Sequence, residues 1–277
     1  MRTFAAALSL LLLLAVAGAS AQTEDSGPLY LALGDSLAAG VGASDRAAKG
    51  YVPLIHRHLQ ETPRWRERDL GLLNLSVPGE TTASMMAPGG QLEQATGEIA
   101  RRNGDADPNS DVEVITIDIG ANDLLDLLLA NLACALNPDE PECQTRLQYT
   151  LALAAANVRT IFRQLRTAAG PDAIIIVMTY YNPFSGTGLP LEQVADEAVA
   201  ELNVTIVAAA GAPEVKALVA DVFPLFAGKA PQLTHITQLP PDVHPNDTGY
   251  ALIAEALVAA LSPTLEATPT PASAPIT

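Results

Sequence analysis

Residues 29–37 have the sequence LYLALGDSL, in which a short apolar run is followed by Gly34, Asp35 and Ser36. An apolar run of this length is typical of a buried strand, and Gly34 ends it. Similar strand-like runs follow at 70–75, 112–119, 173–179 and 215–222. Helical patterns lie between and after them, at 51–60, 91–102, 124–136, 145–169, 191–210 and 249–261. Strands separated by helices predict an α/β fold with a mainly parallel sheet covered on both faces.

The two ends of the chain differ in composition from the rest. Residues 1–21 combine Arg2, an apolar run and the small residues Ala19, Ser20 and Ala21, which is the pattern of a secretory signal peptide. Residues 262–277 are rich in Pro, Thr, Ala and Ser, which predicts a disordered tail. We therefore expect a secreted protein with one folded domain over residues 22–261.

Charge and composition exclude several classes of function. The whole chain has a net charge of −16, and removal of the leader takes Arg2 and no acidic residue with it. So acidic a chain is not expected to bind nucleic acid, which needs clustered Lys and Arg. No segment after the leader is expected to span a membrane. Cys134 and Cys143 are too few for a structural zinc site, and in an exported protein we expect them to form a disulfide.

Four polar loops lie next to predicted strands or before the last predicted helix. They contain Ser36, Gly79, Asn122 and His244. In parallel sheets, sites form beyond the carboxyl ends of the strands, so these residues are candidates for one site. A serine hydroxyl needs an adjacent base to act as a nucleophile, and an imidazole can serve as that base near neutral pH. The N–H groups of Ser36 and Gly79 and the amide of Asn122 are candidate donors to an oxyanion.

These loops resemble the four sequence blocks of the SGNH, or GDSL, hydrolase family. The matching residues are Gly34-Asp35-Ser36-Leu37, Gly79, Gly120-Ala121-Asn122-Asp123 and His244, in the family's order and spacing. The resemblance covers about residues 29–261. It implies a flavodoxin-like three-layer α/β/α sandwich and ester hydrolysis without a metal or other cofactor. It also implies Ser36 as nucleophile, His244 as base, and an oxyanion hole of Ser36, Gly79 and Asn122; the role of Gly79 rests on the resemblance alone.

One block departs from the family pattern. The family's Asp stands three residues before the His, and Pro241 occupies that position here, whereas Asp242 is two residues before His244. Either Asp242 or a backbone carbonyl is then left to orient the imidazole. We expect Asp35 to have a structural role in the nucleophile turn, and His235 is a competing candidate for the base.

The substrate is predicted only by class. The leucine-rich segment 124–136 follows Asn122 directly, and our hypothesis is that it forms a wall of an acyl pocket pinned by the Cys134–Cys143 disulfide; an ordinary buried helix is the alternative. The segment 180–184, YYNPF, is a candidate for substrate contact. We predict a secreted serine esterase or lipase acting on a small-molecule, lipid or glycan ester. A polysaccharide acetylesterase and a catalytically silent extracellular binding module remain alternatives.

Overall fold

The computed structural model describes residues 27–130, 133–134, 137 and 140–266. The predicted signal peptide lies outside the described residues, as do residues 267–277 of the predicted tail.

The centre of the domain is a parallel sheet of five strands, ordered β2-β1-β3-β4-β5. The strands are β1 (Leu29–Leu33), β2 (Gly71–Asn74), β3 (Val112–Ile117), β4 (Ile174–Met178) and β5 (Leu218–Ala220). This is the strand order of flavodoxin-like doubly wound sheets, in which ligands bind outside the carboxyl ends of the strands where the order reverses, here between β1 and β3. The predicted α/β sandwich with a mainly parallel sheet is confirmed.

Strands β1 and β4 are apolar on both faces because helices cover both. Every residue of β1 and β4 is buried, and β4 consists of Ile, Val and Met, which suit a fully covered parallel strand. The edge strand β5 is shorter than the predicted 215–222. Lys216 has a φ of 49°, and the N–H groups of Val215 and Lys216 both donate to the Ala212 carbonyl, so the chain turns before the strand begins.

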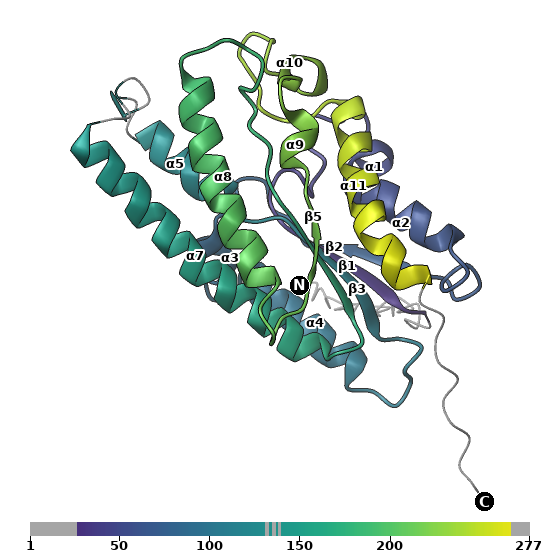
Figure 1. Ribbon diagram of the computed structural model, residues 1–277. Helices are drawn as coiled ribbons and strands as arrows, with labels where there is room; N and C mark the ends of the chain where they lie inside the picture. The colour runs from purple at the N-terminus through teal and green to yellow at the C-terminus, as the bar shows by residue number, and fades with distance from the viewer. Residues whose placement is uncertain (1–26, 131–132, 135–136, 138–139, 267–277) are drawn as a thin grey trace, which may run out of the picture.

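Helices form the two outer layers (Figure 1). In the figure α1, α2 and α11 lie on one side of the sheet, and α3, α4, α5, α7 and α8 on the other. The longer ones are α2 (Tyr51–Glu61), α4 (Gln91–Asn103), α5 (Ala121–Ala130), α7 (Pro141–Ala169), α8 (Leu191–Ala210) and α11 (Asp247–Glu266). The short ones are α1 (Arg46–Lys49), α3 (Thr82–Met85), α9 (Phe223–Phe226) and α10 (Ala230–Leu233).

Three helices extend several residues beyond their predicted ends, and the first of them, α5, begins at Ala121 rather than at 124. Helix α7 begins at Pro141 rather than at 145, since proline at the first position loses no helical hydrogen bond and Glu142 favours the first turn. Helix α11 continues to Glu266 through Pro263, past the helix end predicted at residue 261. Leu265 packs against the core, which explains why the helix continues.

Helix α11 also corrects the expectation that no later segment is apolar enough to cross a membrane. Within the described ranges it alone has the length and composition to do so. Its side chains Tyr250, Ile253, Leu257 and Leu261 are nevertheless buried in the core of the domain. We therefore interpret α11 as a helix of the outer layer whose apolar side chains pack into the core of the domain.

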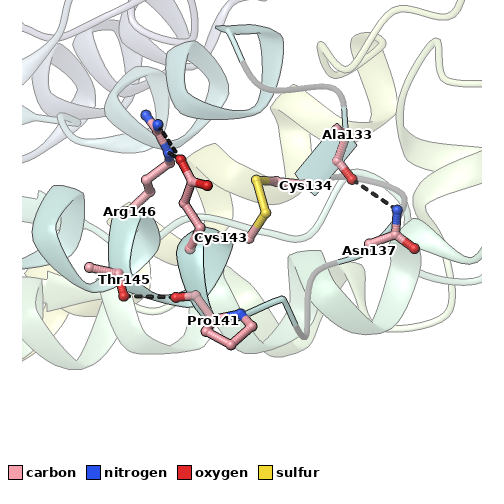
Figure 2. Close-up of a disulfide and its surroundings, with 8 residues drawn as sticks. Ala133, Cys134, Asn137, Pro141, Cys143, Thr145 and Arg146 are labelled. Carbon is pink, nitrogen blue, oxygen red and sulfur yellow. Dashed lines mark hydrogen bonds and ion pairs between the residues drawn. A yellow bond between two sulfur atoms is a disulfide. The ribbon is translucent and has the colours of Figure 1, made fainter.

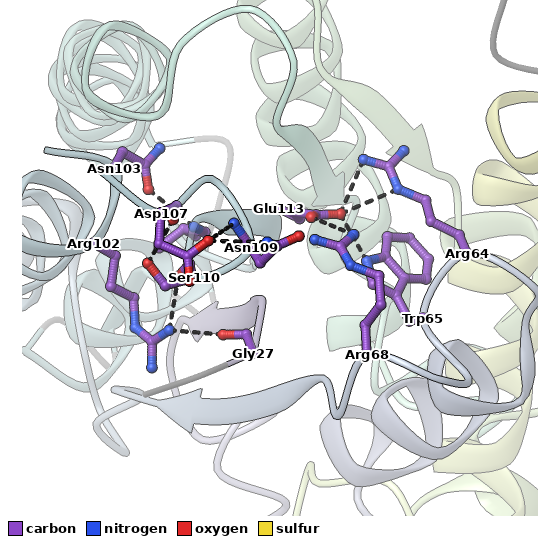
Figure 3. A network of polar contacts seen from close by, with 11 residues as sticks. Gly27, Arg64, Trp65, Arg68, Arg102, Asn103, Asp107, Asn109, Ser110 and Glu113 are labelled. Atoms are coloured by element: carbon purple, nitrogen blue, oxygen red, sulfur yellow. Dashed lines mark hydrogen bonds and ion pairs between the residues drawn. The ribbon is translucent and has the colours of Figure 1, made fainter. Parts of the chain in front are cut away.

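A polar cluster around Glu113 fastens the amino-terminal end of β3 (Figure 3). Glu113 of β3 accepts a hydrogen bond from the indole of buried Trp65 at 2.8 Å and pairs with Arg68 at 2.6 Å and Arg64 at 3.1 Å. These bonds tie the segment before β2 to β3.

Candidate active site

Ser36 lies in a tight turn after β1. The Asp35 carbonyl accepts the Ala39 N–H at 3.1 Å, and the Ser36 carbonyl accepts the Val41 N–H at 2.9 Å. No regular helix starts here, so Ser36 is not a helix N-cap. The turn is possible because Gly34 has a φ of 146°, a value that other residues rarely adopt.

Three side chains from the two ends of the domain meet in a chain of hydrogen bonds. The Ser36 Oγ lies 2.8 Å from His244 Nε2, although the residues are 208 apart in sequence. His244 Nδ1 lies 2.5 Å from Asp242 Oδ1, and the same oxygen accepts the His244 N–H at 3.0 Å. The two-residue offset thus lets the carboxylate reach the ring, and the ring contacts Asp242 rather than a backbone carbonyl.

Tyr181 holds the loop that carries His244. The hydroxyl of Tyr181 donates to the Val243 carbonyl at 2.8 Å, and its ring stacks on Phe226 with 4.1 Å between centroids. Partial burial of Asp242 acts to raise its pKa, but the hydrogen bonds from the backbone and ring of His244 outweigh burial and lower the pKa. Asp242 is therefore ionised at neutral pH, as an acceptor for the Nδ1 proton must be.

The competing candidate His235 has both ring nitrogens occupied. Its Nε2 lies 2.8 Å from the Gly42 carbonyl and its Nδ1 2.6 Å from the Gln238 amide. A carbonyl can only accept, so Nε2 carries the proton and Nδ1 accepts from Gln238. His235 contacts the His244 loop through its backbone, where its N–H donates to the His244 carbonyl at 3.0 Å. This arrangement suits a structural role better than that of a base.

The three candidate oxyanion donors lie around Ser36. Across the described part of the chain, the N–H groups of Ser36 and Gly79 have no acceptor. Gly79 has a φ of 83°, and a Cβ there would meet nothing within 4 Å, so the backbone faces open space. Asn122 donates one of its two amide hydrogens to the Glu80 carbonyl at 2.9 Å, which fixes the amide and leaves the second hydrogen for a ligand.

Gln91 joins the first two loops, a function that the sequence analysis missed. Its amide accepts the Gly34 N–H at 3.0 Å and donates to the Gly34 carbonyl at 2.8 Å and to the Glu80 carboxylate. Ser84 also donates to Glu80. A buried Gln at the start of an amphipathic helix is the only sequence signal, and it does not reveal the partner.

Ser36 and His244 open onto a cavity of about 800 Å³. Gly79 and Asn122 line it near these residues, and most of its remaining lining is apolar. The apolar lining comes chiefly from α5, α7, α8 and the segment after β4: Leu124, Leu125, Leu127, Leu128, Leu147, Tyr180, Tyr181, Pro183, Phe184, Leu191, Val194, Ala198 and Val199. The predicted segments 124–136, in the part that the structure describes, and 180–184 both contribute.

Cys134 and Cys143 form a disulfide that also lines the cavity (Figure 2). The bond joins the chain beyond α5 to the first turn of α7, and the Cα atoms are 5.4 Å apart. It thereby ties the chain that follows α5 to α7, which lines the cavity. Among the residues that the structure describes, no group of His, Cys, Asp and Glu is arranged to hold a metal ion.

The geometry of the site agrees with the family to which the sequence matches. Residues 32–252 match the GDSL-like lipase/acylhydrolase family, and this match spans most of the chain. The chain belongs to that family. This GDSL hydrolase is therefore an enzyme that hydrolyses esters. A comparison with curated proteins finds no match.

Solved structures share the fold of this GDSL hydrolase. A lipase, Lip_vut3 from a goat rumen metagenome, has a TM-score of 0.61 and 25% identity, over 84% of this chain and 96% of that one. The phospholipase A1 of Streptomyces albidoflavus NA297 has a TM-score of 0.59 and 20% identity, over 84% and 99%. The acetylxylan esterase Axe2 of Geobacillus stearothermophilus has a TM-score of 0.55 and 18% identity, over 86% and 96%.

Proposed function

We propose that this GDSL hydrolase cleaves carboxylic esters through an acyl-enzyme on Ser36, with His244 as general base and acid and Asp242 as its partner. The observation that carries the proposal is the 2.8 Å contact between Ser36 Oγ and His244 Nε2 at the mouth of the cavity. The hydroxyl donates to a ring nitrogen whose lone pair is free because Nδ1 faces the Asp242 carboxylate. This is the arrangement that an activated serine nucleophile requires.

The proposed reaction has two halves. Ser36 Oγ bonds to the ester carbonyl carbon while its proton passes to His244 Nε2, and the carbonyl oxygen becomes an oxyanion facing the Ser36 and Gly79 N–H groups and the Asn122 amide. The carbon–alkoxy bond then breaks, and the alcohol leaves with the Nε2 proton. Water next gives a proton to Nε2 and bonds to the acyl carbon. Collapse releases the acid and returns the proton to Ser36.

The cavity favours an acyl chain longer than acetyl. A methylene group fills about the same space as a water molecule, roughly 30 Å³, so a cavity of about 800 Å³ exceeds what an acetyl group needs many times over. Each methylene buried against Leu124, Leu128 or Val194 contributes about 0.8 kcal/mol of binding. We therefore favour an esterase or lipase of medium or long acyl chains over a polysaccharide acetylesterase. A silent binding module would need neither the aligned base nor the free N–H donors.

A ladder of p-nitrophenyl esters from acetyl to palmitoyl, with acetylated xylan as a separate substrate, tests this function. The proposal expects kcat/KM to rise with chain length from acetyl to at least octanoyl, and Ser36→Ala to abolish turnover of every ester. Acetate release from xylan at a rate above that of any p-nitrophenyl ester would support the acetylesterase instead. No turnover of any ester by the wild-type protein would support the binding module.

We also propose that the protein is exported. The disulfide between Cys134 and Cys143 suits an oxidising compartment, and residues 1–21 have the composition of a signal peptide. Expression of the full chain in a secreting bacterium, followed by mass spectrometry of the medium, tests this. The expected species begins near Gln22 and carries no free thiol; an uncleaved chain confined to the cytoplasm would contradict it.

A further inference from the structure

Two carboxyl groups lie buried directly behind the nucleophile turn. Asp35 is 2% exposed and Asp118, which follows β3, is 1% exposed. Over the described ranges, neither forms an ion pair with Lys or Arg. Charges buried without a counter-ion are costly, so this pair calls for a physical explanation. The proposed reaction does not use Asp118.

Asp118 holds the turn from the neighbouring strand. Its Oδ1 accepts the N–H of Asp35 at 2.9 Å, and the Tyr51 hydroxyl of α2 lies 2.5 Å from its Oδ2. A Cβ on Gly34 would lie 2.6 Å from the Asp118 carboxyl group, so the carboxyl fills the space beneath the turn. The residue before Ser36 is thus fastened to the end of β3.

Asp35 fixes the other side of Ser36. Its Oδ1 accepts the Leu37 N–H at 2.8 Å and its Oδ2 accepts the Tyr180 hydroxyl at 2.7 Å. The amides on both sides of Ser36 are therefore directed inward, to the two carboxyl groups. The Ser36 N–H alone is left for the cavity side, where an oxyanion would form.

The surroundings of Asp118 favour its neutral form. Burial raises the pKa of Asp118 well above its ordinary value, and the nearby charge of Asp35 raises it further, while the Tyr51 hydrogen bond acts in the opposite direction. The titratable groups around it include the tyrosine hydroxyls Tyr30, Tyr51, Tyr180, Tyr181 and Tyr250, whose own pKa values are raised by burial and by Asp118. Burial also raises the pKa of Asp35, but the hydrogen bonds from Leu37 and Tyr180 and the nearby His244 act in the opposite direction and favour its negative charge.

We propose that Asp118 is a positioning residue for Ser36 that works as a neutral, proton-bearing acid, holding the turn through the Asp35 N–H and leaving Asp35 as the one buried negative charge near His244. The positioning role of Asp118 rests on the proposed function of Ser36 as the nucleophile. The protonation of Asp118 rests only on the folded structure around it. Each part has its own readout.

The variants Asp118→Asn and Asp118→Leu separate the two parts. The Asn side chain keeps an oxygen for the Asp35 N–H and an amide for Tyr51 but cannot ionise, whereas Leu keeps the approximate size and offers neither. We expect the Leu variant to have a kcat at least tenfold below that of the Asn variant with p-nitrophenyl butyrate, at similar KM, because the displaced turn affects the reacting atoms and not the acyl pocket. Equal kcat values for the two variants would overturn the positioning role.

The protonation is tested by urea unfolding of wild type and Asp118→Asn from pH 5 to pH 9. A raised pKa in the folded state means that the folded chain binds a proton that the unfolded chain has lost above about pH 4. As the pH rises, the folding equilibrium constant of the wild type should therefore fall relative to that of the Asn variant, by up to tenfold for each pH unit. The fall ends where the pH passes the folded-state pKa of Asp118. Parallel curves over the whole range would overturn the proposal. This result does not depend on activity, so it stands even if the Leu variant fails to fold.

A control separates this proposal from the proposed function. If Ser36→Ala retains turnover, the nucleophile is misassigned and the kcat comparison loses its basis. The difference in pH dependence between wild type and Asp118→Asn would be unaffected, because it concerns only the buried pair. Retained turnover with diverging stability curves therefore contradicts the function and supports the neutral acid.

Discussion

Replacement of Asp242 tests how the carboxylate acts on His244, and the structure gives the expected size of the effect. One oxygen, Oδ1, both accepts the His244 N–H and faces the ring Nδ1. In Asp242→Asn the amide oxygen can keep both contacts, so the ring retains its tautomer and only the charge is lost. A charge about 4 Å away contributes about 1 kcal/mol in water and about 4 kcal/mol near a protein surface. The Asp242 side chain is 39% exposed, which places the loss near 2 kcal/mol.

That free energy corresponds to an acylation rate constant about thirtyfold below wild type for Asp242→Asn. Asp242→Ala also removes the orientation of the ring, so the loss should approach the roughly 10²–10⁴-fold worth of a general base. Stopped-flow measurement of the acylation rate with p-nitrophenyl butyrate gives both values without interference from deacylation. An Ala variant within threefold of wild type would refute the role of Asp242 and leave a Ser36–His244 dyad. Equal losses in the Asn and Ala variants would refute the division into charge and orientation.

Three further substitutions address the oxyanion hole, the cavity and the disulfide. Asn122→Ala should lower kcat by about 10²–10³-fold, as for other oxyanion donors, with circular dichroism showing an unchanged fold; a loss below threefold would contradict the assignment. Leu128→Trp should lower kcat/KM for decanoyl esters far more than for acetyl esters, while Leu153→Trp on the exposed face of α7, where Leu153 is 43% exposed, should change neither. Replacement of both Cys134 and Cys143 by Ser should lower the free energy of unfolding by about 2–3 kcal/mol in urea titrations; unchanged stability would show that the short closed loop adds no constraint.

The strand ends made much of this site predictable from sequence. Ser36, Gly79 and Asn122 each follow a strand of one parallel sheet, so their convergence follows once the strands are recognised. His244 enters from the loop before α11, and its approach to Ser36 was expected from the resemblance to the family rather than from spacing. The contact between Asp242 and the ring depends on how tightly the loop turns, which a two-residue offset does not specify.

The supporting residues were not predictable in the same way. Asp118 lies in an apolar strand-like run, where a lone acid signals a buried polar contact but not its partner, since Asp35 is 83 positions away. Gln91 bonds Gly34 over 57 positions. Such pairings are set by packing of helices on the sheet, and a single sequence shows periodicity but not which side chains meet across layers. The start of β5 and the end of α11 depended on a left-handed residue, Lys216, and on packing of Leu265, which local propensity does not show.

The central claim is that Ser36 forms the covalent intermediate. Incubation of the purified protein with a p-nitrophenyl alkylphosphonate, followed by intact mass and peptide mapping, measures this directly. We predict one label per chain, on the peptide that contains Ser36, with release of one equivalent of p-nitrophenol and complete loss of esterase activity. A label on another residue that accompanies the loss of activity, or full esterase activity in a chain labelled at Ser36, would contradict it.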